Sequence, residues 1–315
     1  MGRWNHAGNP RRHIARGACP LLRVGLRLAF GLGLVAAARA GMAQAQWVSD
    51  VEAATFVNSN IGNATAGPDV HSVTGLTEAI STGPFFELRP GTNLTLKAEA
   101  RDTQLDRYTA LDGESLAVKV RLDQKFGLGR QAPRVYASAT DARLFVRDDL
   151  SSGWQQALTM GGRSLFGERL ALHGELGWDR RTGTAVPEVR AGLPSNVFDQ
   201  SARRWTVGGD YTLTGALLLQ LESTVRRGEA DYIETTTLAD TFEGATAVAR
   251  DPGFGPSVFV EKIQVHALFL DARLSWALGE HTAVNFSFRR QWTVDNTGTL
   301  YTRSVPAITY QYRFD

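Results

Sequence analysis

Apolar and polar residues alternate with a period of two along this chain, in segments of about ten residues that recur to its end. Successive side chains of a β-strand point to opposite faces, so each such segment predicts a strand with one apolar and one polar face. The alternation is evident in LTLKAEAR (94–101), SLAVKVRLD (115–123), LALHGELGWD (170–179) and RWTVGGDYTL (204–213). The dominant secondary structure is therefore expected to be β.

Turn-rich stretches divide the pattern into twelve predicted strands, and a count of ten or fourteen is also compatible with it. The predicted ranges are 47–57, 76–88, 94–105, 114–126, 134–146, 153–166, 169–181, 203–213, 216–232, 258–278, 282–295 and 303–314. Short connections alternate with longer polar ones, which are expected near 58–72, 106–113, 147–153, 182–203, 234–257 and 296–302. Each pair of strands joined by a short connection is expected to form a hairpin.

The first 45 residues have the composition of a secretory signal peptide. They contain seven arginines and no acidic residue, then an apolar stretch, and they end in the small-x-small sequence Ala43–Ala45. Arg23, Arg27 and Arg39 interrupt the apolar stretch, so a spanning helix of about 20 residues is not expected. A lipoprotein signal around Cys19 is also rejected, because "RGAC" lacks the preceding apolar residues. We therefore predict a signal peptide at 1–45 and one domain at 46–315.

Removal of the predicted signal peptide changes the charge balance of the protein. It takes away seven of 34 basic residues, which leaves 27 against 32 acidic residues and a net charge of −5. The apparent basicity thus belongs to the export signal, and nucleic acid is not an expected partner. The single cysteine is removed as well, so a disulfide scaffold is excluded for the mature domain.

Two architectures accommodate strands with one apolar and one polar face. A soluble sandwich or lipocalin-like barrel buries the apolar face, whereas a membrane barrel turns that face to lipid and encloses a polar lumen. Twelve strands make a barrel too wide for ordinary side chains to fill. Small residues on the apolar face, such as Ala98 and Gly174, would leave voids in a soluble core, whereas lipid fills such gaps. Aromatic residues near the strand ends also favour the membrane barrel.

The last strand carries a second signal in "YQYRF", where Tyr310, Tyr312 and Phe314 alternate with polar residues. With the export signal and the alternating strands, this makes the sequence resemble the bacterial outer-membrane β-barrel class. The resemblance implies an up-and-down antiparallel barrel in the outer membrane of a Gram-negative bacterium, beside lipid and lipopolysaccharide. It also implies that Tyr310, Tyr312 and Phe314 are read by the barrel-assembly machinery. Asp315 departs from the pattern, in which the aromatic residue is last.

The polar faces of the predicted strands supply charged side chains of both signs to the expected lumen. The predicted lumen-lining residues are Lys97, Glu99, Arg101, Lys119, Arg121, Asp123, Arg163, His173, Glu175, Asp210, Glu222, Arg226, Asp271, Arg273, Arg289 and Arg313, with Asp179 on the same face. Such charges either brace the wall through ion pairs or select solutes by size and charge, and both roles are compatible. A slight excess of cations favours anionic solutes.

A carboxylate-rich outer loop is expected at 229–251. It contains Glu229, Asp231, Glu234, Asp240, Glu243 and Asp251 against Arg250. Such a loop is either solvated or binds divalent cations beside lipopolysaccharide.

A barrel hydrolase requires a nucleophile beside a base, and four histidines remain after residue 45: His71, His173, His266 and His281. His173 is expected to face the lumen with Glu175, and His266 is expected to face outward. No nucleophile motif, paired carboxylates or metal-ligand spacing accompanies them. We therefore assign no catalytic, cofactor-binding or metal-binding residues.

These observations favour passive passage of small hydrophilic solutes through a narrow lumen. The alternative is a structural, assembly or polysaccharide-export-associated barrel whose lumen is closed by its own side chains. A barrel hydrolase is the third hypothesis.

Overall fold

The structure is a computed structural model that describes residues 46–65, 67–184, 186–189, 191–235, 244–255 and 257–314. The signal peptide expected at 1–45 lies outside the described residues. Among the described residues, no helix is long and apolar enough to cross a membrane. The helical content there consists of three single 3₁₀ turns, η1 (Gly67–Asp69), η2 (Thr109–Leu111) and η3 (Asp149–Ser151).

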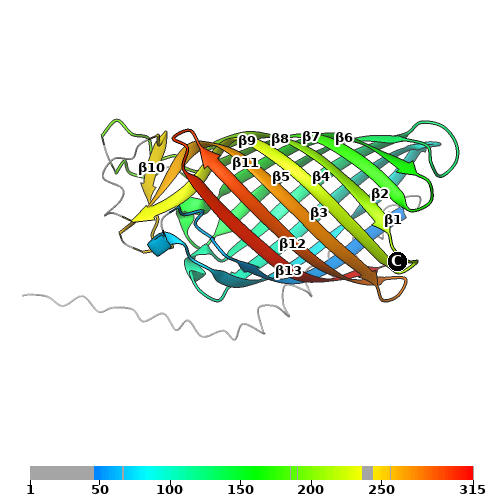
Figure 1. The fold of residues 1–315 in the computed structure, drawn as a ribbon, viewed down its shortest axis with the longest axis horizontal. Helices are drawn as coiled ribbons and strands as arrows, with labels where there is room; N and C mark the ends of the chain where they lie inside the picture. The colour runs from blue at the N-terminus through cyan, green and yellow to red at the C-terminus, as the bar shows by residue number, and fades with distance from the viewer. Residues whose placement is uncertain are drawn as a thin grey trace, which may run out of the picture. The chain divides into compact units, whose positions relative to one another are not determined.

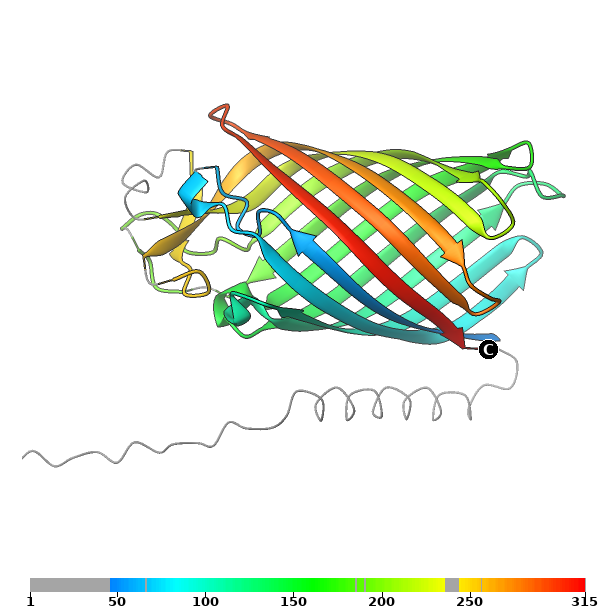
Figure 2. The same cartoon turned by 60° about the horizontal axis from the view of Figure 1, so that its bottom comes forward.

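Twelve antiparallel strands form a closed barrel, which confirms the predicted fold (Figures 1 and 2). Each strand pairs with its neighbours in sequence, β9 pairs with β11, and β13 pairs with β1 to close the sheet. The wall strands are β1 (Gln46–Asn58), β2 (Val73–Arg89), β3 (Thr92–Leu105), β4 (Gly113–Lys125), β5 (Arg134–Val146), β6 (Gly153–Phe166), β7 (Leu170–Gly183), β8 (Gln200–Thr212), β9 (Leu217–Thr235), β11 (Val258–Ala277), β12 (Thr282–Asp295) and β13 (Leu300–Phe314). Each one overlaps a range predicted from the alternation.

The apolar face of the barrel points outward. Val118 is 59% exposed, and Leu172 and Phe286 are each 44% exposed, although all three lie in the middle of strands. A water-soluble protein does not leave so many large apolar side chains on one continuous surface. The exterior is therefore a lipid-facing surface, and the expectation that apolar side chains face lipid is confirmed.

The two ends of the barrel differ in the length of their connections. Short turns join β2 to β3, β6 to β7, β8 to β9 and β11 to β12, and Figure 1 shows the C-terminus at this end. Gly91 and Gly167, in two of these turns, have φ of 81° and 68°, a left-handed conformation that glycine adopts without strain. In outer-membrane barrels the short turns are periplasmic. The opposite end is therefore the outer end.

The connection from β12 to β13 is shorter than predicted. We expected a polar loop at 296–302, but β13 begins at Leu300. The carboxylate of Asp295 accepts hydrogen bonds from the backbone N–H groups of Thr297 and Thr299, both at 2.8 Å. This Asx-type turn replaces the expected loop.

A thirteenth strand, β10 (Ala247–Arg250), was not predicted. It pairs with Phe259–Lys262 of β11, on the edge of β11 that β12 occupies further along the barrel. Ala247, Val248 and Ala249 are all buried, so β10 has no polar face and shows no alternation. Figure 1 shows β10 at the outer end, beyond the wall strands.

The long connections pack together over the outer end as a structure that we call the outer cap. It consists of the described residues of 59–72, 147–152, 184–199 and 244–257, together with the ends of β9 and β11. Its apolar core contains Ala64, Leu150, Val197, Phe198, Ile233, Ala247, Ala249 and Val260. Residues 46–58 thus form a wall strand, whereas the described residues of 59–72 belong to the cap.

The final strand places its aromatic residues as the sequence suggested. Tyr310 lies on the outer face and is 46% exposed. Tyr312 and Phe314 follow on the same face, with their rings edge to face at 4.9 Å. The alternation at the C-terminus therefore serves a lipid-facing strand that also closes the barrel against β1.

Gly83 gives a test of the close backbone approach between β2 and β3. A β-carbon at this position would lie 1.9 Å from the carbonyl oxygen of Leu96. We predict that Gly83→Ala destabilises the barrel by about 1–3 kcal/mol, as overpacking does in well-packed structures. The urea midpoint of the heat-modifiable form on an unboiled gel measures this change.

Gly162→Ala is the matched control, because the nearest atom to its new β-carbon would be the Arg134 carbonyl oxygen at 3.6 Å. This variant should keep the wild-type midpoint. Equal midpoints for both variants would contradict the prediction.

Candidate functional site: the inner face of the barrel

Contacts between strands that are not adjacent identify the inner face. Lys97 on β3 reaches Asp50 on β1, and Arg163 on β6 reaches Asp210 on β8. Two strands separated by a third are about 9.6 Å apart, so their side chains meet on the concave face of a closed sheet. The polar face is therefore the inner one.

The predicted lumen-lining residues lie on this face. Strand register connects those without a direct contact: Lys119 is opposite Lys97, and Arg273 is opposite Gln220, which itself bonds Asp210. The full predicted set shares this parity: Lys97, Glu99, Arg101, Lys119, Arg121, Asp123, Arg163, His173, Glu175, Asp210, Glu222, Arg226, Asp271, Arg273, Arg289 and Arg313. Their role along a solute path stays a prediction.

Asp50 links three strands near the periplasmic end. One carboxylate oxygen accepts a hydrogen bond from Lys97 Nζ at 2.6 Å, and the other accepts one from Arg313 Nε at 2.8 Å. Because β13 and β1 close the barrel, the Arg313 contact spans the closing pair of strands. Hydrogen bonds between oppositely charged groups are shorter and stronger than neutral ones. Asp50 therefore braces the closure.

A second network crosses β4, β5 and β7. The Nε and Nη2 groups of Arg121 each donate a hydrogen bond of 2.8 Å to the carboxylate of Asp123. The Arg121 guanidinium lies 4.0 Å from the ring centroid of Tyr136. The Tyr136 hydroxyl donates to Glu175. Gly161 on β6 leaves room for this contact, since a β-carbon there would lie 2.6 Å from the Tyr136 ring.

A third group occupies β6 to β9. Asp210 accepts hydrogen bonds from Arg163 at 2.7 Å and from Gln220 at 3.0 Å. Arg226 on β9 donates to Asp179 on β7 at 3.2 Å. The Arg163–Asp210 and Arg226–Asp179 contacts each cross the strand between the partners and stiffen the wall against shear.

The partner of His173 differs from the expected one. His173 Nε2 lies 3.3 Å from Glu222 on β9, whereas Glu175 bonds Tyr136. The strand between them makes room, because a β-carbon at Gly208 would lie 2.6 Å from the imidazole. Among the described residues, His173 has no recorded contact with a serine, threonine or cysteine.

Two of the nine predicted lumen-lining cations lack a carboxylate partner among the described residues. Lys119 and Arg273 are exposed, and the described residues contain no ion pair or hydrogen bond to either side chain. Paired cations on the same face are also accessible: the side chains of Arg163 and Arg289 are 49% and 52% exposed. Water therefore reaches the inner face between the ion pairs.

Sequence reasoning missed several members of the inner network. Four of them form side-chain hydrogen bonds with residues of other strands: Asp50, Tyr136, Arg204 and Gln220. Asp50 lies on β1, whose alternation is weakened by small residues on both faces. Tyr136 lies on β5, where "VYASATDARLFV" left the parity ambiguous. The sequence offered one signal for these residues: each is a polar residue on the same face as a charged residue that was predicted to line the lumen.

The carboxylate-rich loop expected at 229–251 is not a loop throughout. Glu229, Asp231 and Glu234 belong to β9, and β10 occupies 247–250. Asp240 and Glu243 lie outside the described residues. Asp251 is only 2% exposed, so it is not solvated as we expected. Within the described part of the chain, no three His, Cys, Asp or Glu side chains are placed to hold a metal ion.

Asp251 is a buried acid in the outer cap. Its carboxylate accepts a hydrogen bond from the Gly253 N–H at 2.9 Å. Burial, and next the negative charge of Asp148, raise the pKa of Asp251 to about 6. The pKa of Asp148 is itself raised by burial. The cap thus contains two acids that resist ionisation.

Comparison with known proteins shows the fold. No protein-family model matches this sequence, and no curated protein matches it. Among solved structures the chain is similar to the COG4313 outer membrane channel from Pseudomonas putida F1, with a TM-score of 0.57 and 9% identity over 87% of this chain and 97% of that one. It is also similar to the KdgM porin in complex with disordered oligogalacturonate (TM-score 0.42, 8% identity, 84% and 99% coverage) and to the β domain of the Bordetella autotransporter BrkA (0.44, 10%, 84% and 98%). The first likeness shows the fold alone, a closed β-barrel like that of the outer membrane channel to which the chain is similar.

The buried carboxyl of Asp251 predicts a pH-dependent cap. Because its folded-state pKa exceeds the ordinary value of about 3.9, the folded cap binds more protons than the unfolded one between about pH 4 and 6. Stability of the cap should therefore fall as pH rises through this window. Hydrogen exchange of the β10 amides, corrected for the intrinsic pH dependence, measures it.

Asp251→Asn should remove most of this pH dependence and keep the cap protected at pH 7. Asp149→Asn, a change at an exposed neighbour in η3, should leave it intact. An unchanged pH profile in Asp251→Asn would show that another group controls the cap.

Proposed function

We propose that this barrel is a narrow passive channel for small hydrophilic solutes. The observation that carries the proposal is the solvent exposure of charged side chains on a concave face. Arg121, Arg163 and Arg289 remain 41%, 49% and 52% exposed although they point into a closed sheet. An interior filled by packed side chains would bury them. A polar interior that water can enter is suited to hydrophilic solutes.

Selectivity is proposed to come from Lys119 and Arg273, the two predicted lumen-lining cations without a carboxylate partner among the described residues. Seven of the nine predicted lumen-lining cations have a carboxylate within 3.3 Å, so they brace the wall and contribute little net field. Lys119 and Arg273 retain their charge without a partner among the described residues. Their field favours anionic solutes, as rings of basic side chains do in anion pores.

A closed barrel with a structural, assembly or polysaccharide-export-associated role is the second candidate. The outer cap favours it, because apolar residues from several loops pack together at the outer end. In the channel proposal this cap acts as a constriction, and in the alternative it seals the lumen. The two differ in whether purified protein conducts ions.

The hydrolase hypothesis receives little support from the inner face. His173 and Glu222 form a base–carboxylate pair, but nucleophilic catalysis also needs a hydroxyl or thiol beside the base. We propose no catalytic residues and no cofactor. As partners we propose outer-membrane lipid, lipopolysaccharide and, during insertion, the barrel-assembly machinery acting on Tyr310, Tyr312 and Phe314.

Planar-bilayer recording of the refolded protein tests the channel. We expect conductance steps and a reversal potential that indicates anion preference in a salt gradient. The double variant Lys119→Glu/Arg273→Glu should shift the reversal potential toward cation preference, because four units of charge change on the inner face.

Arg130→Glu/Arg169→Glu, an equal charge change in the exposed periplasmic turns, should shift the reversal potential much less. Silence over a range of voltages and salt concentrations would refute the channel and leave the closed-barrel alternative. Conductance whose selectivity ignores Lys119 and Arg273 would refute only their assigned role.

A further inference from the structure

Four strands carry two arginines in succession, and the barrel sends the two to opposite sides. The pairs are Arg180–Arg181 on β7, Arg203–Arg204 on β8, Arg226–Arg227 on β9 and Arg289–Arg290 on β12. Arg204 bonds Thr159 two strands away, and Arg226 bonds Asp179, so both point inward. Successive side chains alternate between faces. Arg203 and Arg227 therefore point outward, as does Arg180 beside the inward Asp179.

The outward arginines of β7, β8 and β9 are neighbours. Arg203 lies directly opposite Arg227 in the strand register, and Arg180 lies one diagonal step from Arg203. All three are exposed, and the described residues contain no hydrogen bond or ion pair to any of them. Like charges placed directly opposite each other destabilise a sheet. An external anion would remove this repulsion.

The arginines lie at the border of the apolar exterior. One step toward the periplasmic end on the same face, β7 has Trp178, β8 has Trp205 and β9 has Val225. Arg180 is three residues from the end of β7 and Arg203 is three from the start of β8, both at the outer end. Tryptophan marks the level of lipid headgroups in membrane proteins. The arginines are therefore at the headgroup level of the outer leaflet.

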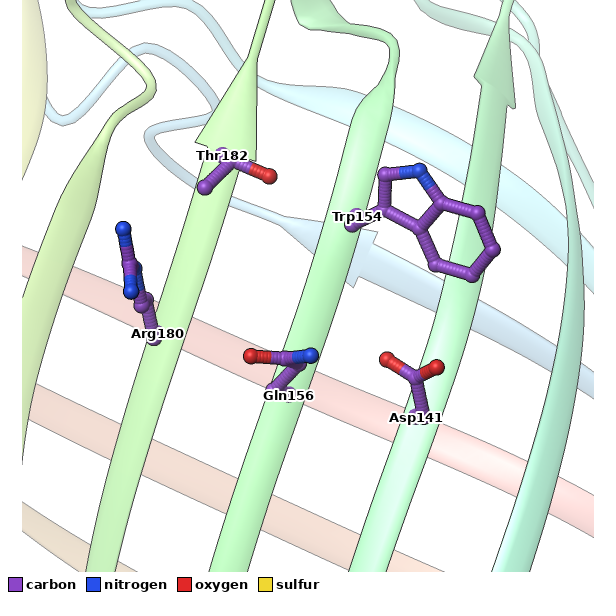
Figure 3. A pocket seen from close by; sticks show the side chains of 5 residues that line it. All are labelled: Asp141, Trp154, Gln156, Arg180 and Thr182. Atoms are coloured by element: carbon purple, nitrogen blue, oxygen red, sulfur yellow. The ribbon is translucent and has the colours of Figure 1, made fainter.

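A pocket adjoins the arginines on the same outer wall. It has a volume of about 410 Å³ and is lined by Asp141, Trp154, Gln156, Arg180 and Thr182. Figure 3 shows Asp141, Gln156 and Arg180 in one row across three strands, with Trp154 and Thr182 in the next row. Arg180 thus belongs both to the pocket and to the arginine cluster.

The pocket chemistry differs from that of a simple anion site. Trp154 on β6 offers an aromatic face. The guanidinium of Arg143 on β5 lies 5.5 Å from its ring centroid, whereas Arg180 is on β7, the other neighbour of β6. Gln156, Thr182 and Asp141 offer donors and acceptors for hydroxyl and amide groups. An amphipathic ring with hydroxyls matches this lining, and phosphate matches the arginines beside it.

We propose that β5 to β9 hold the phosphorylated glucosamine headgroup of lipopolysaccharide. The sugar occupies the pocket at Trp154, and its phosphates bind Arg180, Arg203 and Arg227. The site lies on the opposite side of the wall from the lumen, so it is independent of solute passage. Acidic side chains occupy a different sector of the exterior: Glu78, Asp102 and Glu114, aligned in the register on β2 to β4, face outward there.

Native mass spectrometry of the protein purified from outer membranes in detergent tests the proposal. Bis-phosphorylated lipid A is added as the probe, with dephosphorylated lipid A and phosphatidylglycerol in parallel. We expect one tightly retained bis-phosphorylated lipid A per barrel. Arg203→Gln/Arg227→Gln should bind it roughly 30-fold more weakly, given the usual contribution of each basic side chain near an anionic headgroup.

Two further variants separate the parts of the site. Arg130→Gln/Arg169→Gln removes the same charge at the periplasmic turns and should bind like wild type. Trp154→Leu should weaken lipid A binding and leave phosphatidylglycerol binding unchanged. Heat modifiability of each variant establishes that the barrel is folded before binding is measured. Should the double glutamine variant not fold, Arg203→Gln alone replaces it, with an expected loss of roughly 5-fold in binding.

The outcomes decide between occupants. Equal retention of phosphatidylglycerol, with the same dependence on Arg203 and Arg227, would overturn the glycolipid in favour of any anionic lipid. Retention of lipid A that is unaffected by the arginine and Trp154 variants would overturn the site. A dimer mass that is lost in the arginine variant would assign this surface to a second copy of the chain instead.

Discussion

Pairing of β1 with β13 is the constraint on which the rest of the structure depends. In a lipid bilayer each unpaired backbone N–H or C=O costs several kcal/mol, so a sheet can cross only when no edge remains. Residues 49–56 of β1 supply this pairing along residues 307–314 of β13. Once the sheet is closed, every side chain of the wall faces either lipid or the interior. The period-two alternation then decides the environment of each residue.

The inner face combines rigidity with access to water. Asp50, Asp210 and Asp179 each form an ion pair with a cation from a strand that is not adjacent. These ion pairs connect strands that share no backbone hydrogen bonds and so stabilise the wall. Ion pairs that stay partly hydrated avoid the large desolvation cost of fully buried ones. The interior can therefore hold many charges of both signs. In the proposed channel, Lys119 and Arg273 add positive charge that no carboxylate neutralises. The outer cap, which is packed from apolar residues, lies at the other end of the barrel.

The sequence predicted the wall well because one physical rule applies along every strand. The approximate ranges of the twelve wall strands follow from alternation together with the turn-rich stretches that interrupt it. The facing of Lys97, His173 and Arg313 follows from alternation. The rule fails where both faces are buried, as in β10, whose Ala247, Val248 and Ala249 show no contrast. It also says nothing about partners across the barrel. Glu175 was expected beside His173, but Gly208 allows Glu222 to approach from β9 instead. Such pairings depend on the shear of the barrel, which single segments do not reveal.

The extra length of β11 has a consequence for attempts to shorten the outer cap. β11 extends beyond the pairing with β12, and β10 covers the edge that would otherwise be bare. An uncovered strand edge is a template for pairing with another chain. Trimming the loop that contains β10 would thus expose this edge of β11 at the outer end of the barrel. Barrels altered in this way would tend to associate end to end by pairing their exposed strands.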